Sequence, residues 1–156
     1  MEAIITLGIS ASGKSTFAGV VPHTEINRDD IRFGLVMPDA KGSWKKYKFS
    51  KENESRTTEI ELKMFHDAVV NKEDIIISNT NLNKNIRRQW IKRCLKAGYK
   101  VKIVVLNVPL EVAKERDSCR RERSVGCDVI ASQFEKMQKA LGALEVEKEL
   151  FGVGVE

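Results

Sequence analysis

Residues 8–16 of this 156-residue sequence have the types and spacing of a phosphate-binding loop. They read Gly-Ile-Ser-Ala-Ser-Gly-Lys-Ser-Thr and match the pattern G-x-x-x-x-G-K-[ST]. Gly8 and Gly13 let the backbone approach an anion without a Cβ in the way. Lys14 can reach the β- and γ-phosphates of a nucleotide, and the Ser15 hydroxyl is the usual Mg²⁺ ligand. The alternative interpretation is a glycine-bearing turn that binds no ligand.

The same pattern predicts an ATP site with Mg²⁺ as its metal. Successive backbone amides in the second half of the loop are expected to point into one concavity at the positive end of a helix, where phosphate binds well. The predicted ATP-binding residues are Gly8, Ala11, Ser12, Gly13, Lys14, Ser15 and Thr16, and Ser15 is the predicted metal ligand.

The segments around this loop predict how it is positioned. Residues 3–7 read as a buried strand and residues 16–21 as a helix start, which is the strand–loop–helix arrangement that the motif requires. Apolar runs and helical spacing predict further strands at residues 23–27, 74–78 and 100–106, and helices at residues 51–70, 84–97, 109–118 and 128–141, the last capped by Asp128. We therefore expect an α/β fold, a P-loop NTPase-type parallel sheet flanked by helices on both faces.

A polar tract follows the short strand of this predicted sheet. Residues 27–32 read Asn-Arg-Asp-Asp-Ile-Arg. Because ligands of open α/β sheets lie at the carboxyl ends of strands, Asp29, Asp30 and Arg32 are functional candidates. The alternative is that Asn27 or Asp29 only caps the helix that follows.

Two later tracts also allow two interpretations each. Residues 41–51 interleave lysines with Trp44, Tyr47 and Phe49. Such a combination can hold phosphates and stack bases, although a solvated segment with its aromatic side chains packed inward fits as well. Residues 79–83, Asn-Thr-Asn-Leu-Asn, follow a predicted strand and either belong to the site or make a turn that caps the next helix.

Arginines gather between the last two predicted helices. Arg116, Arg120, Arg121 and Arg123 precede a Ser-Val-Gly turn. A basic segment in this position has the character of a lid, because the planar guanidinium grips phosphate in two places and stays charged. The alternative is a charged surface turn.

Composition sets broad limits on the protein. The chain is 42% hydrophobic and 31% charged, with a net charge of +5 and a pI near 9.1, so one domain with a core and an anionic partner are expected. No apolar run approaches the roughly 18 residues of a membrane span. The three cysteines suit neither a disulfide framework nor a zinc site. We expect a cytoplasmic protein without a membrane partner; the sequence leaves its oligomeric state open.

Taken together, these tracts resemble the kinase domain of bacteriophage polynucleotide 5′-hydroxyl kinases, over roughly residues 4–142. The P-loop alone is shared by many functions, but the Asn-Arg-Asp-Asp-x-x-Arg and Thr-Asn-Leu-Asn tracts in this order are more particular. The matching tracts are residues 8–16, 26–32, 76–83, 107–109 and 116–129. The resemblance implies a P-loop kinase domain over residues 1–142, with its lid at about residues 117–127. Residues 143–156 would then be a helical extension and a partly ordered tail.

The resemblance also implies roles for single residues. Lys14, Asp29 and Arg120 would be catalytic: Lys14 on the phosphates, Asp29 as the general base for a 5′-hydroxyl, and Arg120 as the lid arginine on the donor phosphates of ATP. Arg32 would engage the phosphate 3′ to the accepting nucleotide. The polynucleotide-binding residues implied in this way are Arg32, Asn79, Thr80 and Val125.

Two departures from the family pattern qualify this hypothesis. Relatives usually place an Asp within the tract that matches Ser78-Asn79, and neither residue here is acidic. An Asn at this position can still hydrogen-bond to Arg32 or to a metal-bound water, but it supplies no charge. No Asp-x-Asp-Gly-Thr signature occurs in these residues, so we expect no 3′-phosphatase activity.

The expected activity is transfer of the γ-phosphate of ATP to the 5′-hydroxyl end of DNA or RNA, as in nucleic-acid end repair. One alternative is a P-loop kinase for a small molecule such as a nucleoside, nucleotide or antibiotic. The other is a nucleic-acid-binding ATPase that transfers no phosphate.

Overall fold

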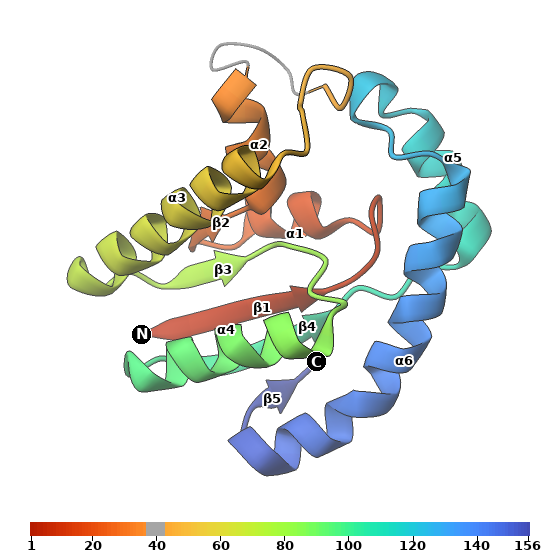
Figure 1. Ribbon diagram of the computed structural model, residues 1–156. Coiled ribbons are helices and arrows are strands. Elements are labelled where there is room, and N and C mark those ends of the chain that lie inside the picture. The colour runs from red at the N-terminus through yellow and green to blue at the C-terminus, as the bar shows by residue number, and fades with distance from the viewer. Residues whose placement is uncertain (37–42) are drawn as a thin grey trace.

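The computed structural model describes residues 1–36 and 43–156, so the first two residues of the tract at residues 41–51, Lys41 included, lie outside the described residues. Its centre is a five-stranded parallel sheet of order β2-β3-β1-β4-β5 (Figure 1). The strands are β1 (Glu2–Leu7), β2 (Thr24–Ile26), β3 (Ile75–Ile77), β4 (Lys100–Val105) and β5 (Gly154–Val155). The first four confirm the strands predicted from the sequence.

The helices follow the predicted order as well. They are α1 (Lys14–Val20), α2 (Arg28–Val36), α3 (Lys51–Val70), α4 (Lys84–Lys96), α5 (Leu110–Ser118) and α6 (Cys127–Phe151), with a short 3₁₀ turn η1 (Arg121–Arg123) between the last two. The helix α3 has the predicted bounds because the Ser50 hydroxyl caps its first turn, accepting from the amide of Asn53.

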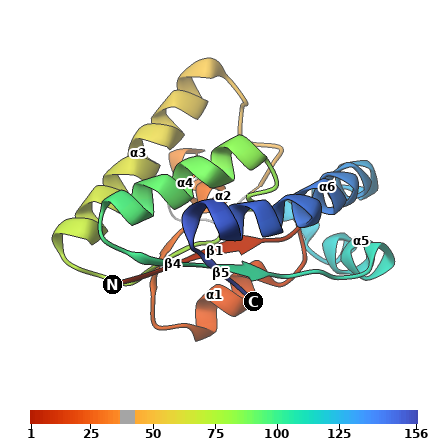
Figure 2. The same cartoon turned by 90° about the horizontal axis from the view of Figure 1, so that it is seen from below.

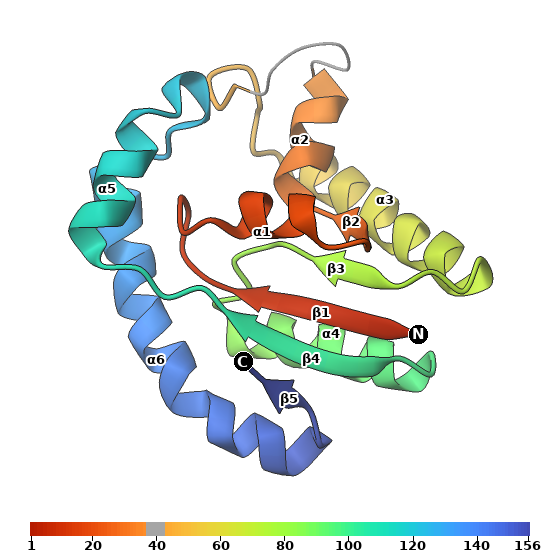
Figure 3. The same ribbon diagram turned by 180° about the vertical axis from the view of Figure 1, so that it is seen from behind.

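Helices cover both faces of the sheet, as predicted. Alternate strand residues point to opposite faces, so β1 sends Ala3, Ile5 and Leu7 one way and Ile4 the other. The first set packs in the larger core beneath α3, α4 and α6, whereas Ile4 packs in a small core under α1 (Figure 2). Figure 3 shows α1 from this second side, next to the loop that leaves β1.

The C-terminal end of the chain differs from the prediction. The last helix does not end near Leu141 but runs to Phe151, and residues after it form β5 rather than a partly ordered tail. Leu144 and Val153 are buried in the larger core, which explains why the helix continues past Gly142. The helix begins after Gly126, so Asp128 lies in its first turn and is not its cap.

A fully buried ion pair joins α4 to the second half of α6. The Arg87 guanidinium donates to both carboxylate oxygens of Glu147, at 2.6 and 2.9 Å, and Arg87 also donates to the carbonyl of Asn81 at 2.8 Å. These bonds satisfy two charged groups that burial would otherwise penalise. Residues after 142 therefore pack as an integral part of the same sheet-and-helix unit. Within residues 1–36 and 43–156, none of the helices is both long and apolar enough to cross a bilayer.

Candidate active site

A cleft of about 1350 Å³ opens at the carboxyl ends of β1, β2 and β3. Its walls are the loop after β1, the start of α2, one face of α3 and the connection from α5 to α6. All the predicted site residues line it except Gly8: Ala11, Ser12, Gly13, Lys14, Ser15, Thr16, Asp29, Arg32, Asn79, Thr80, Arg120 and Val125. The fold therefore gathers side chains that are more than 100 residues apart in the sequence.

The phosphate-binding loop has the backbone shape that the motif predicts. Gly13 has φ = 100° and leads directly into α1 without a side-chain cap, so the first amides of that helix remain available for an anion. Gly8 lies behind the loop: a Cβ there would lie 2.6 Å from the Ser12 Oγ and 2.9 Å from the carbonyl of Leu106. The buried Ser12 hydroxyl has no hydrogen-bond partner among the described residues. This cradle fits a phosphate chain.

The electrostatic surroundings of Lys14 are unusual for a lysine. Burial, followed by the positive charge of Arg120, lowers the pKa of the Lys14 ammonium to about 7, and the negative charge of Asp29 opposes this shift. Arg120 and Asp29 are thus both close enough to Lys14 to influence its charge. A lysine of lowered pKa inside a cleft is a frequent sign of a functional site, because an anionic ligand restores its charge.

The start of α2 positions the predicted general base. Asn27 caps the helix, since its Oδ1 accepts from the amides of Asp29 and Asp30 at 3.0 and 3.1 Å. The capping alternative therefore holds for Asn27 and leaves the Asp29 carboxylate free for another partner. That partner is Arg32, one turn later, whose Nη1 donates to the Asp29 Oδ1 at 3.0 Å.

The predicted lid segment is shaped by one buried carboxylate. Asp117 accepts from the hydroxyl of Ser124 at 2.6 Å and from the amides of Val125 and Gly126 at 3.1 and 2.9 Å. These hydrogen bonds outweigh burial and lower the pKa of Asp117. Arg120 also reaches Asp117, at 3.4 Å, and both Arg120 and Val125 line the cleft.

The same segment touches the opposite wall of the cleft. The Arg123 guanidinium lies 2.7 Å from the Asp30 carboxylate of α2, and the Trp44 indole donates to the Arg123 carbonyl at 3.1 Å. In Figure 1 these parts meet where the η1 turn approaches the segment that precedes α3. These two contacts join the predicted lid segment to α2 and to the segment before α3, across the cleft.

Comparison with known proteins assigns the chain to a family. Residues 4–144 match the family model described as AAA domain. The chain belongs to this AAA domain family. It is also 30% identical, over 148 residues, to a protein of Autographa californica nuclear polyhedrosis virus that is provisionally named bifunctional polynucleotide kinase/RNA ligase. That match covers 88% of this chain and 21% of the viral protein.

Solved structures show the same fold. The AAA domain superposes on a chain of the Pnkp1/Rnl/Hen1 RNA repair complex with a TM-score of 0.73 and 22% identity, covering 90% of this chain and 45% of that one. A gluconokinase from Sinorhizobium meliloti 1021 matches with a TM-score of 0.52 and 16% identity, over 86% of this chain and 74% of that one. The chain thus spans less than half of its first structural relative. At 22% and 16% identity, these two matches show a shared fold.

The AAA domain contains a residue that sequence reasoning missed, Glu54 of α3. The Arg32 Nε and Nη2 donate to its two oxygens at 3.0 and 2.6 Å, and the Tyr47 hydroxyl donates to it at 2.6 Å. The hydrogen bond from Arg32 lowers the pKa of Glu54 to about 2, against the opposing effect of burial. On Arg32, burial disfavours the charge, but the bonds to Glu54 and Asp29 outweigh it and raise the pKa. Arg32 is thereby held between two carboxylates.

The departure from the family pattern at Ser78-Asn79 has a structural explanation. The sequence allows Asn79 to contact Arg32 or a metal-bound water, but its side chain has other partners among the described residues. Its Oδ1 accepts from the Arg28 amide at 2.7 Å, and its Nδ2 donates to Glu61 at 3.3 Å. Burial raises the pKa of Glu61, which lines the cleft about two helical turns beyond Glu54 on the same face of α3. Acidic groups therefore lie beside the end of β3, but they come from other elements.

Two further polar residues position the cleft and escaped prediction. Gln133 of α6 accepts from the Ser10 amide of the phosphate-binding loop at 2.7 Å. Glu25 of β2 accepts a hydrogen bond from the hydroxyl of Ser78. Of the missed residues, Glu54 and Glu61 alone could have been found from the sequence, because their spacing of seven residues places both on one face of α3. For Gln133 and Glu25, no local pattern distinguished them.

Proposed function

We propose that this chain transfers the γ-phosphate of ATP to the 5′-hydroxyl end of a polynucleotide. The observation that carries the proposal is the pairing of Asp29 with Arg32 in the same cleft as Lys14 and Arg120. A carboxylate next to an arginine suits an acceptor that presents a hydroxyl beside a phosphate diester. The printed name of the viral relative supports the same substrate class.

In this mechanism the donor side of the cleft binds and stabilises phosphate charge. The amides of residues 11–16 hold the β- and γ-phosphates at the start of α1. Lys14 and Arg120 face the equatorial oxygens of the transferred group, where negative charge is redistributed during the reaction. Placing two cations there reduces the barrier without a covalent intermediate.

On the acceptor side, Asp29 orients the 5′-hydroxyl and accepts its proton as the new P–O bond forms. The proton moves to the Asp29 carboxylate, the terminal P–O bond of ATP breaks, and ADP leaves. Arg32 holds the phosphate that follows the terminal nucleotide. Asn79, Thr80 and Val125 line the same cleft as Asp29 and are the further acceptor contacts that we propose.

The oxygen-rich residues of the cleft fit Mg²⁺ as the metal of this reaction. Ser15, the second residue of α1, lines the cleft and would hold the metal through its hydroxyl, with phosphate and water oxygens as the other ligands. Within residues 1–36 and 43–156, no cluster of three or more His, Cys, Asp or Glu side chains forms a separate metal cage. When bound, Mg²⁺ supplies charge neutralisation between the β- and γ-phosphates.

The acceptor class is tested by competition. The purified protein is given ATP labelled at the γ-phosphate, a 5′-hydroxyl oligonucleotide, and an excess of a nucleoside, a nucleoside monophosphate, gluconate or an aminoglycoside. We expect label on the oligonucleotide that none of the small molecules suppresses. Label on a small molecule with none on the oligonucleotide would overturn the proposal in favour of a small-molecule kinase. Salt-sensitive oligonucleotide binding without any transfer would overturn it in favour of a binding ATPase.

Replacing Glu54 by Gln tests whether Arg32 must be held in place. Gln keeps the size of the side chain, but it has one oxygen acceptor and no negative charge. It therefore cannot accept from both Arg32 Nε and Arg32 Nη2, and Arg32 loses its fixed orientation. We expect the KM for the oligonucleotide to rise by a factor of roughly 10–100, since one charge-assisted hydrogen bond is worth roughly 1.5–3 kcal/mol. The KM for ATP should stay unchanged.

The matched control for this prediction is Glu52→Gln, an exposed glutamate in the same first turn of α3. Steady-state kinetics on both substrates separates the two variants. A rise in the KM for ATP equal to that for the oligonucleotide would show that Glu54 supports the whole cleft rather than Arg32.

A further inference from the structure

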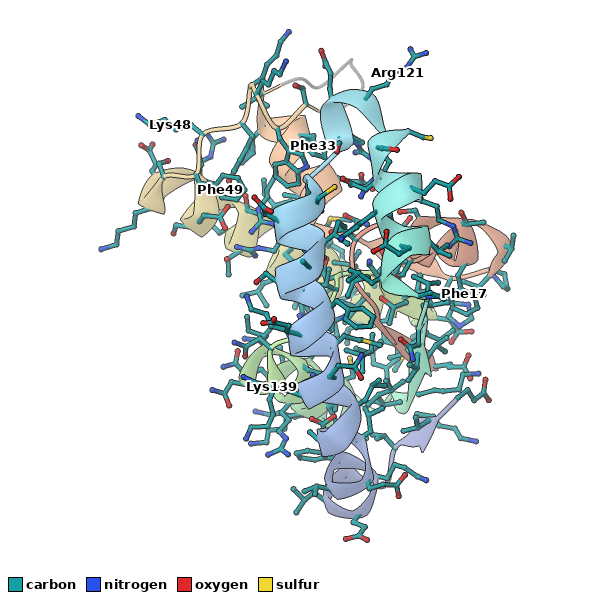
Figure 4. The ribbon with its side chains drawn as sticks, turned by 90° about the vertical axis from the view of Figure 1, so that its right-hand side faces the viewer. Phe17, Phe33, Lys48, Phe49, Arg121 and Lys139 are labelled. Atoms are coloured by element: carbon teal, nitrogen blue, oxygen red, sulfur yellow. The ribbon has the colours of Figure 1, made fainter. Side chains whose placement is uncertain are left out.

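Aromatic side chains gather at the mouth of the cleft, next to the proposed acceptor side. Phe33 comes from α2, and Trp44, Tyr47 and Phe49 come from the segment before α3. Phe33 packs edge-on against Trp44 with ring centroids 4.7 Å apart, and Trp44 stacks on Phe49 at 5.5 Å and 18°. Figure 4 shows Phe33 and Phe49 on the same side of the molecule, with Lys48 beside Phe49.

Burial explains part of this cluster but not Phe49. Phe33 and Tyr47 are only 4% and 5% exposed and act as a small core beneath the cleft mouth. Phe49 is 62% exposed although it is a large apolar side chain. It nevertheless lines the cleft together with Trp44 and Arg32. Trp44 stacks on the Phe49 ring and Tyr47 packs edge-on against it at 4.9 Å, so the ring is held in place while its exposed part can receive a flat partner.

The position of Phe49 relative to the proposed chemistry indicates what that partner is. The Arg32 guanidinium carbon lies 5.3 Å from the centre of the Phe49 ring, and the same guanidinium donates to Asp29. A strand with its 5′-hydroxyl at Asp29 and its next phosphate at Arg32 continues toward Phe49. The exposed residues Lys45, Lys46, Lys48 and Lys51 flank this position and match the charge of the strand.

We propose that Phe49, supported by Trp44, is a stacking platform for a nucleobase of the acceptor strand, 3′ to its terminal nucleotide. This inference rests on the proposed function. Every base has a π-face, so the platform recognises a strand without reading its sequence. Arg32 then binds the backbone while Phe49 binds a base, and the two together select a polynucleotide over a mononucleotide.

The test combines Phe49 variants with acceptors that lack single bases. The acceptors are 5′-hydroxyl octanucleotides, either intact or with one abasic site at the second, third or fourth nucleotide. We expect Phe49→Ala and Phe49→Leu to lower kcat/KM on the intact strand about tenfold. Phe49→Trp should retain it, because it keeps the aromatic face. At one of the three positions, the abasic site should lower the kcat/KM of the wild type by a similar factor. The same abasic site should leave the kcat/KM of the Phe49→Ala variant unchanged.

The control is Val70→Ala, which removes an equally exposed apolar side chain at the far end of α3. A thermal scan of each variant confirms that it is folded. The inference is overturned if Phe49→Ala transfers phosphate as fast as the wild type. It is also overturned if the ratio of wild-type to Phe49→Ala kcat/KM is the same on the intact strand and on every abasic acceptor. Failure of the proposed function is read separately, from the wild-type protein alone, as absence of label on the intact strand.

Discussion

Replacing Asp29 with Asn should lower kcat by a factor of about 10²–10⁴, the usual contribution of a general base. Asn has the shape of Asp and its Oδ1 can still accept the 3.0 Å hydrogen bond from Arg32, so the geometry of the pair survives. The substitution removes the capacity to take a proton from the attacking hydroxyl. Binding of ATP should persist, because the phosphate-binding loop is untouched. Single-turnover transfer rates and ATP titration measure the two quantities independently.

The matched control for Asp29 is the same change one residue later. Asp30 is bonded to Arg123 rather than to Arg32, so Asp30→Asn should cost far less in kcat than Asp29→Asn. If Asp29→Asn turned over at the wild-type rate, another group would have to be the base. An equal loss of kcat in both variants would show that the negative charge of this segment matters, and not proton transfer to Asp29.

Replacing Lys14 with Ala should lower kcat/KM for ATP by about 10²–10³, because a cation aimed at the transferred group in a water-poor site is typically worth several kcal/mol. The lowered pKa adds a second signature. With a pKa of about 7, Lys14 is mostly neutral at pH 8 in the free protein, and the negative phosphates of ATP restore its charge. Binding at pH 8 should therefore take up close to one proton, and ATP affinity should weaken as the pH rises above 7.

Calorimetric titration of ATP in two buffers of different ionisation heat measures this proton uptake. At pH 6 Lys14 is already charged, so its share of the uptake should disappear. Proton uptake by the Lys14→Ala variant measures the share that comes from the nucleotide itself. Lys63→Ala removes an exposed lysine that is paired with Asp67, and it controls for the loss of one positive charge. Equal proton uptake in the wild type and in Lys14→Ala at pH 8 would contradict the assignment.

Much of the fold follows from local sequence patterns. The isoleucine run at residues 75–77 can only be satisfied by burial on both faces of a sheet, so it predicts β3 directly. Ser50 and Asn83 mark the starts of α3 and α4, because their side chains accept hydrogen bonds from backbone amides in the first turn of each helix. The phosphate-binding loop is equally local, since its glycines and its lysine are all within nine residues.

The parts that the sequence did not predict depend on contacts between distant segments. Glu54 is 22 residues from Arg32, and nothing in either segment shows that α2 and α3 pack together. The helix predicted to end at residue 141 continues without a break as α6, because Leu144 and Glu147 are buried against other elements. The strand β5 contains only Gly154 and Val155, too short a run to show the alternation of a strand.

The most direct test of the proposed function is transfer of labelled γ-phosphate from ATP, with Mg²⁺, to DNA and RNA oligonucleotides of the same sequence. Each is supplied with a 5′-hydroxyl and, as the control, with a 5′-phosphate. We expect label on the 5′-hydroxyl strands alone, and the ratio of their rates gives the preference between DNA and RNA. Absence of label on every strand, from folded protein that binds ATP, would contradict the proposed function.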